Sequence, residues 1–290
     1  MTRKFVLALL LSGVSSPVLA AQGENDSHWR VGISGGTTLV GQGDDQAYVS
    51  ASVTREIGDG YIQLSATKVD AGDVQGFINA VPASTEQLSL SAGIGLGAVS
   101  LDGDVTIGRR KFDSELIGND GNPVIVDSDG RIFGIGAAIT YDLPVGDNGF
   151  LSPSLSIDYN SVDIGRVATL VSGRQATIEE REEGVGVSLG VSYVHLFGED
   201  GAHSFGPFAA LVASSNSTAF APGNTIGGQR MARVVAFRNV PGEGDVWGEF
   251  GASASFGLGG SLRLSLNASQ SLGFDGPEST SLGAGVSFSF

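Results

Sequence analysis

Large apolar residues alternate with serine and glycine over long stretches of this chain, and this period-two pattern is the strongest constraint on its fold. One stretch interleaves Ser89, Ser91, Gly93, Gly95 and Gly97 with the apolar series Leu88, Leu90, Ala92, Ile94 and Leu96. Residues 185–193 and 250–258 follow the same alternation. Successive side chains of a strand point to opposite faces, so the pattern predicts strands with one apolar face and one face of small polar groups.

The composition of the polar face indicates what surrounds these strands. A soluble β-sandwich usually carries long charged side chains on its wet face. Here charged residues make up only 16% of the chain, and glycine contributes 45 of its 290 residues. Small polar groups suit a crowded lumen and large apolar groups suit lipid, so we expect an all-β fold, a transmembrane antiparallel up-and-down β-barrel. The soluble β-sandwich is the alternative, because alternation occurs in both folds.

Turn residues divide the chain into about twelve predicted strands, an even number as in bacterial single-chain barrels. Their expected ranges are 29–40, 46–56, 60–70, 86–97, 99–112, 130–143, 150–162, 184–197, 204–216, 246–258, 261–272 and 280–290. The connections after even-numbered strands are short, whereas four after odd-numbered strands, 71–85, 113–129, 163–183 and 217–245, are long. Such barrels have short periplasmic turns and longer external loops. The asymmetry therefore places both termini in the periplasm and the long loops outside.

The beginning of the chain has the pattern of an exported protein. Arg3 and Lys4 precede an apolar run at 5–11, and small residues suitable for cleavage follow at Ala20 and Ala21. The apolar run is far shorter than the ~20 residues of a membrane-spanning helix. We expect cleavage after Ala20, with Ala21 as the alternative. The predicted divisions are a signal peptide at 1–20, a short periplasmic lead at 21–28 and the barrel domain at 29–290.

Charge and cysteine content exclude several classes of function. The formal net charge is -15, and such a surface repels nucleic acid. Cysteine is absent, so the chain has no disulfide, thiol nucleophile or thiolate metal site. We expect no cofactor and no metal ion.

Two tryptophans fall at ends of predicted strands. Trp29 lies where the first strand would enter from the periplasm, and Trp247 lies at the external end of the tenth. Because amphipathic rings favour the boundary between lipid and water, we expect both at membrane interfaces.

The last thirty residues form a predicted closing hairpin. Residues 261–270 are followed by a strand at 281–290 that ends in the aromatic-x-Phe motif of Phe288 and Phe290. This hairpin resembles the end of an autotransporter translocator domain. The resemblance implies a twelve-stranded outer-membrane barrel, and it implies that Phe288 and Phe290 form the signal read by the barrel assembly machinery during insertion. Residues 21–28 would reach at most about 28 Å when fully extended. We therefore expect a barrel without a passenger or a pore-threading helix.

A basic cluster near the external end of the fifth predicted strand is a candidate lipid site. Arg109, Arg110 and Lys111 should reach the outer headgroup level, and Lys68 on the third strand could join them. Cations pair with phosphate oxygens, so we expect contacts with lipopolysaccharide. Ordinary snorkelling at a membrane boundary is the alternative.

The loop at 217–245 is a second candidate site. It contains Arg230, Arg233 and Arg238 beside an apolar stretch. Loops of this length are usually functional or disordered. The loop could fold inward and constrict the pore, or stand outside and contact a partner.

Catalytic chemistry is not expected. Enzymes among outer-membrane barrels that use histidine need it near the outer leaflet, whereas the topology places His28, His195 and His203 at the periplasmic end. The acidic run at 179–183 falls in a predicted external loop, where a solvated charge cluster is favoured over a cation site. We therefore name no catalytic residue.

These patterns favour a monomeric integral outer-membrane protein that contacts outer-membrane lipid and lipopolysaccharide and acts as a passive pore or surface structural protein. An adhesin-like module that binds through its external loops is the alternative, and an outer-membrane enzyme comes third. Fold alone does not choose between them.

Overall fold

The computed structural model describes residues 28–40, 46–71, 83–112, 115–117, 124–169, 175–216, 225–226, 229–230, 244–259, 261–273 and 279–290. This part of the chain is almost entirely strand, with one 3-10 turn, η1 (Glu199–Gly201). No helix in it is long and apolar enough to cross a membrane.

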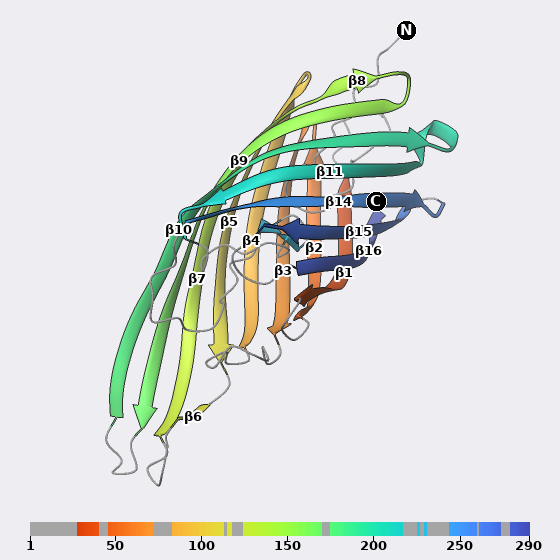
Figure 1. Cartoon of the computed structure of the whole chain (residues 1–290). Helices are drawn as coiled ribbons and strands as arrows, with labels where there is room; N and C mark the ends of the chain where they lie inside the picture. Colours follow the sequence, from red (N-terminus) through yellow and green to blue (C-terminus); the bar gives the residue numbers. More distant parts are fainter. Residues whose placement is uncertain are drawn as a thin grey trace.

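Twelve long strands of the described chain form one antiparallel barrel (Figure 1). They are β1 (Trp29–Val40), β2 (Gln46–Ile57), β3 (Gly60–Ala71), β4 (Ala83–Leu96), β5 (Val99–Phe112), β7 (Val124–Tyr141), β9 (Gly149–Thr169), β10 (Gln175–Phe197), β11 (His203–Ser214), β14 (Asp245–Gly257), β15 (Leu262–Leu272) and β16 (Ser279–Ser289). The short strands β6 (Glu115–Ile117) and β8 (Leu143–Val145) pair with β7 and β9, and β12 (Thr225–Ile226) pairs with β13 (Gln229–Arg230) in a separate sheet. The predicted fold class is confirmed.

The pairing of β1 with β16 and of β7 with β9 closes the ring. The Trp29 amide donates to the Phe290 carbonyl at 2.9 Å, and the Phe290 amide donates to the Trp29 carbonyl at 2.8 Å. Closure matters because lipid offers no partner to an unpaired backbone group. We call the end that carries Trp29 and Phe290 the periplasmic end, as the loop lengths predict, and the opposite end the external end.

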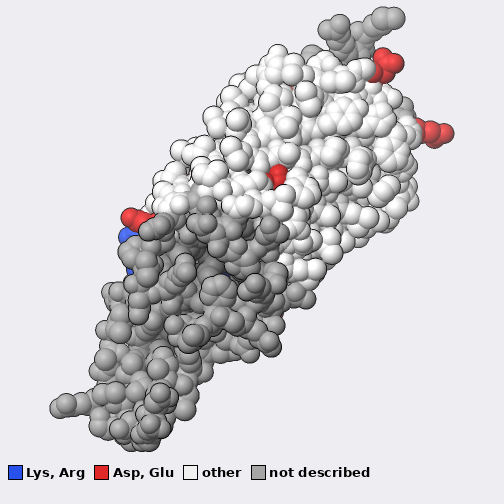
Figure 2. All heavy atoms as spheres, viewed as in Figure 1, with Lys and Arg blue, Asp and Glu red and all other residues white. Residues whose placement is uncertain are grey.

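Apolar side chains cover the outside of the barrel, and small polar side chains line the inside. On β4, Leu90 is 53% exposed while its neighbour Ser89 is 3% exposed. A soluble β-protein would bury its leucines and expose its serines, so the exposed side must face lipid. Figure 2 shows one side of this surface, where the described wall is almost entirely free of Lys and Arg.

The apolar wall has the height of a membrane. On β10 the outward residues from Val185 to Phe197 are mainly apolar and exposed, as the alternation predicted. At about 3.4 Å per residue and a tilt of about 45°, this stretch rises roughly 29 Å, close to the ~30 Å hydrocarbon core of a bilayer. The wall therefore fits the bilayer without a helix.

Of the two tryptophans predicted to lie at membrane interfaces, the structure places one on the outer face. Trp29 faces outward, with the Arg55 guanidinium 5.3 Å from its ring centroid. Trp247 is only 2% exposed, and its Nε1 donates to Glu249 Oε1 at 2.7 Å inside the barrel. The prediction for Trp247 is wrong because Phe250 faces lipid, and a residue three positions away on a strand faces the opposite side.

Three strands run farther outward than the sequence predicted. β7, β9 and β10 extend past the other strands at the lower left of Figure 1. Much of the expected loops 113–129 and 163–183 is therefore strand, including the acidic run at 179–183. The loss of apolar alternation marks the end of the lipid-facing wall, but it does not end backbone pairing. The β9–β10 ladder continues to Thr169 and Gln175.

Candidate functional site

A row of charged residues crosses six neighbouring strands on the outer face. Cross-strand pairing joins Lys68 to Glu86, Glu86 to Arg109, Arg109 to Arg131, Arg131 to Asp163 and Asp163 to Arg181. All six residues are exposed, and we call them the outer charged row. The neighbouring outward positions toward the periplasm begin with Ala66, Leu88, Ile107 and Phe133. The row therefore lies at the external limit of the apolar wall on these strands.

Several cations of the row form ion pairs. Arg109 Nη2 lies 3.2 Å from Asp129 Oδ2, and Lys68 Nζ lies 3.3 Å from Asp70 Oδ1. Each side chain of these pairs is about half exposed or more. Exposed pairs of this kind contribute at most about 1 kcal/mol to folding. Stability alone therefore gives little reason for the row.

The structure divides the predicted lipopolysaccharide cluster between the two faces of the barrel. Lys68, Arg109 and Lys111 face outward. Arg110 is 7% exposed and faces the lumen, where its Nε donates to Thr85 Oγ1 at 3.0 Å. Its placement at the outer headgroup level is therefore corrected, because adjacent residues of a strand point to opposite sides. Arg131 was not among the predicted site residues, although its outward position follows from Phe133, which faces lipid two positions along the same strand.

The inner wall is rich in glycines and in serine and threonine hydroxyl groups. Some of these hydroxyl groups form hydrogen bonds with one another along the wall. Ser89 Oγ and Thr106 Oγ1 lie 2.8 Å apart, as do Ser50 Oγ and Thr67 Oγ1. Each pair joins two strands. These hydroxyls therefore satisfy one another in the wall, as buried polar groups require.

Large inward rings lie against the wall over glycines of neighbouring strands. A Cβ atom built on Gly36 would come 2.5 Å from Tyr48 Cε1, and one on Gly251 would come 2.7 Å from Phe208 Cζ. Tyr61 likewise lies against Gly93. Only glycine leaves room for a ring in these places, so the rings extend along the wall.

Acidic groups gather on one side of the inner wall. Asp104 on β5 and Asp158 on β9 both pair with Gly136 on β7, and a Cβ atom there would lie 2.7 Å and 2.6 Å from their Oδ1 atoms. Nearby, the Tyr61 hydroxyl donates to Asp102 Oδ1 at 3.0 Å. No set of three His, Asp or Glu side chains in the described part could hold a metal ion.

Two further inward arginines, besides Arg110 on β5, lie on a different part of the inner wall. Arg30 on β1 forms an ion pair with Glu56 on β2. Arg263 on β15 donates from Nη1 to Ser255 Oγ at 2.9 Å. The acidic side of the bore is thus formed by β5, β7 and β9, whereas these arginines belong to the strands around the β1–β16 closure.

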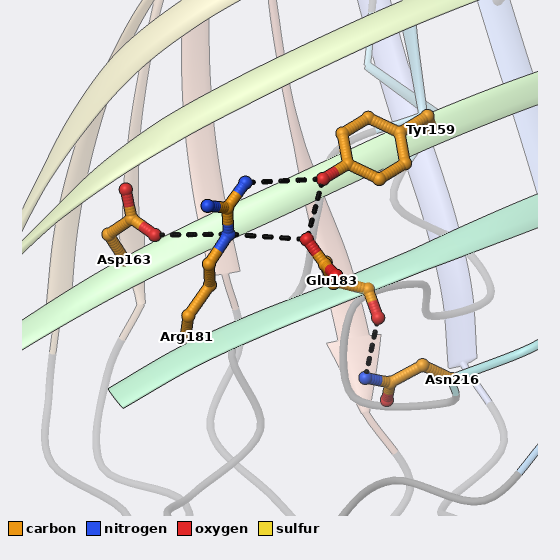
Figure 3. Close-up of polar contacts among 5 residues, drawn as sticks. All are labelled: Tyr159, Asp163, Arg181, Glu183 and Asn216. Atoms are coloured by element: carbon orange, nitrogen blue, oxygen red, sulfur yellow. Dashed lines mark hydrogen bonds and ion pairs between the residues drawn. The ribbon is translucent and has the colours of Figure 1, made fainter. Parts of the chain in front are cut away.

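A polar network lies where β10 leaves β11 at the external end (Figure 3). Arg181 Nε lies 3.4 Å from Asp163 Oδ1 and 3.2 Å from Glu183 Oε2. The Tyr159 hydroxyl donates to Glu183 Oε2 at 2.7 Å and accepts from Arg181 Nη2 at 3.3 Å. The hydrogen bond to Tyr159, with the nearby acidic groups, raises the pKa of Arg181. The network therefore joins β9 to β10.

Comparison with known proteins gives the family. The model of the autotransporter beta-domain matches residues 61–269. The chain belongs to the autotransporter beta-domain family. No curated protein matches it. The family and the barrel fold place this beta-domain in the outer membrane.

Two solved structures share the fold of this autotransporter beta-domain. The translocator domain of autotransporter NalP from Neisseria meningitidis is 14% identical with a TM-score of 0.64, and the match covers 90% of this chain and 88% of that one. The beta domain of the Bordetella autotransporter BrkA is 15% identical with a TM-score of 0.61, and the match covers 90% of this chain and 98% of that one. At these identities the likeness shows the fold alone.

The last strand of this beta-domain presents its aromatic motif to lipid. Phe288 and Phe290 face outward, and their ring centroids are 6.0 Å apart. The predicted outward alternation of the strand is confirmed. The role of these rings as an assembly signal stays a prediction.

The arginines expected to constrict the pore fall largely outside the described residues. Arg233 and Arg238 both lie outside them. The backbone of Arg230 pairs with Thr225 in the β12–β13 hairpin. Constriction by these arginines stays a prediction.

All three histidines of this beta-domain lie at the periplasmic end, as predicted. The His28 carbonyl accepts the Glu56 amide at 2.9 Å. The rings of His195 and His203 both lie near the ring of Phe197, with centroids 6.5 Å and 5.3 Å from its own. The expectation that the protein is not an enzyme stays a prediction.

Proposed function

We propose that this autotransporter beta-domain acts as a passive pore for small solutes in the outer membrane. The observation that carries the proposal is the inner wall, where small hydroxyls and glycines dominate and the rings of Tyr48, Tyr61 and Phe208 lie against glycines.

The number of strands makes the size of the inward groups decisive. Barrels of about 8 strands are filled by their own side chains, whereas those of about 16 leave an aqueous channel. This barrel lies between these limits. Its inward groups include many serines, threonines and glycines, and the rings of Tyr48, Tyr61 and Phe208 extend along the wall, which supports a water-filled bore.

Single-channel conductance of the purified protein in planar bilayers tests the proposal. We expect steady conductance in wild type and lower conductance in Ser253→Trp, because Ser253 faces the lumen beside Gly206. The matched control is Ala252→Trp, which places the same ring on the lipid side of the same strand. A correctly inserted wild-type barrel with no conductance would contradict the proposal.

Surface binding through the external end is the second candidate function. The observation that favours it is the projection of β7, β9 and β10 beyond the other strands. Projecting structure outside the membrane is unnecessary for a simple pore, and functional residues often lie in such external segments.

A further inference from the structure

The outer part of β10 forms a strand edge. β10 pairs with β9 along nearly its whole length, from Gln175 to His195, but its pairing with β11 begins only at Gly186. Within the described residues, no strand pairs with the other side of residues 175–183. This stretch is about 27 Å long at about 3.4 Å per residue, enough for an added strand.

The end of β11 marks the start of this edge. The Ser215 amide donates to the Val185 carbonyl at 2.9 Å, and the Val185 amide donates to Ser215 Oγ at 2.8 Å. One step outward, Asn216 Nδ2 donates to the Glu183 carbonyl at 3.0 Å (Figure 3). Side chains thus replace backbone pairing at this point.

These contacts fix which backbone groups lie along the edge. Backbone groups of alternate residues on a strand point to the same side. Since Val185 and Glu183 direct theirs toward the β11 side, Arg181, Glu179 and Thr177 do so as well. An incoming strand would meet a row of amides and carbonyls with the spacing of a sheet.

The edge is held in place before any partner arrives. Arg181 is fixed by Tyr159, Asp163 and Glu183, and β9 is itself paired with β7 as far as Thr169. A preorganised edge reduces the ordering cost of binding to that of the incoming segment.

The sequence of the edge specifies the charge of its partner. In the sequence, four glutamates at 179, 180, 182 and 183 flank a single arginine, Arg181. Opposite charges on neighbouring strands stabilise pairing, and like charges oppose it. A basic segment would therefore be favoured, whereas a second copy would bring two acidic edges together.

We propose that residues 175–183 of β10 bind an extended segment of a partner protein, with Lys or Arg at alternate positions, as an added strand. Strand addition obtains affinity from main-chain hydrogen bonds and specificity from side chains. This surface lies outside the lumen and does not depend on the pore function.

Binding of synthetic peptides to the purified full-length barrel in detergent tests the proposal. The probe is a fluorescent peptide in which Lys and Thr alternate, followed by anisotropy. We expect saturable binding that weakens with salt, because partly exposed charges are screened over about 10 Å at 0.1 M ionic strength. The same peptide with alternate backbone amides N-methylated should not bind, and a Glu-Thr peptide should not bind.

Two substitutions at one position separate the backbone from the charge. Glu179→Pro removes an edge amide without removing an amide used by β9, and Glu179→Thr removes the charge but keeps that amide. We expect roughly tenfold weaker binding for Glu179→Pro and a smaller loss for Glu179→Thr. Thr177→Pro, at an equivalent edge position, serves if Glu179→Pro does not fold, with heat-modifiable gel mobility as the folding check.

Several outcomes would overturn the proposal. Equal binding by the two Glu179 variants would mean that charge alone attracts the peptide. Peptide binding only after removal of residues 217–243 would make the chain's own segment the occupant. Dimers that Glu179→Pro disrupts would assign the edge to a second copy, and failure of the basic peptide to bind would leave the glutamates as a block against strand pairing.

Discussion

At the scale of single residues, the side of the strand on which a side chain falls decides its environment. Arg109 and Arg110 are adjacent in sequence, yet one faces the lipid boundary and the other faces the lumen. Trp247 and Phe250 are divided in the same way. Where apolar residues alternate along a strand, they show which positions face lipid and which face the lumen. The predictions for Arg110 and Trp247 were wrong because they did not take this alternation into account.

Neutralising the outward cations should weaken lipopolysaccharide binding. We expect a variant with alanine at Lys68, Arg109 and Lys111 to bind lipopolysaccharide roughly tenfold more weakly, because exposed charge contacts contribute about 0.2–1 kcal/mol each. Binding to purified barrel is measured by lipopolysaccharide titration. Arg110→Ala is the matched control and should bind normally. Unchanged binding by the triple variant would remove the lipid role of these cations.

Filling the space at Gly93 should destabilise the barrel. A Cβ atom there would collide with the Tyr61 ring and Asp102 Oδ1. Overpacking of this kind costs about 1–3 kcal/mol, so Gly93→Ala should lower the urea midpoint of unfolding. A double-mutant cycle with Tyr61→Ser checks the cause, since the cost should shrink once the ring is gone. Equal cost in both backgrounds would contradict the contact.

At the scale of the strand, apolar alternation marks the part that crosses lipid. The full length of a strand depends instead on how far it stays hydrogen-bonded to its neighbour. The sequence located all twelve long strands of the described chain. It ended β7, β9 and β10 too early on the external side because their apolar series stops before their hydrogen bonding does. Beyond the membrane, a strand continues because its backbone is hydrogen-bonded to a neighbouring strand, and this neighbour cannot be identified from the local sequence.

Removing Phe290 should impair barrel assembly. Its loss deletes both backbone hydrogen bonds to Trp29 and an exposed ring at the closing strand. We expect less heat-modifiable barrel in the outer-membrane fraction. Phe250→Ala, which removes a lipid-facing ring from another strand, is the control and should assemble normally. Normal insertion of the barrel without Phe290 would contradict the prediction that this residue is part of an assembly signal.

At the scale of the whole molecule, closure brings together groups that lie far apart in the chain. Asp104 and Asp158 meet over Gly136, whereas Arg30 and Arg263 line a different side of the bore. The paired carboxylates and these two arginines thus line different parts of the bore. Carboxylates that line a pore favour cations.

The acidic side should give the proposed pore a preference for cations. We expect a reversal potential that indicates cation preference in a potassium chloride gradient, and a smaller one in the double variant Asp104→Asn, Asp158→Asn. Asp129→Asn changes an acidic residue on the outer face and should leave the reversal potential unchanged. An unaltered value in the double variant would show that these carboxylates do not act on permeating ions.

The sequence by itself determined the strands, the lipid-facing side of each and the end of the barrel that holds both termini. Each of these follows from local alternation, turn residues and loop length. Only the tertiary structure decided which residues share a row around the barrel, which carboxylates meet over Gly136 and where β10 leaves β11. These features depend on register between strands, and register arises from hydrogen bonds between segments that are distant in the chain.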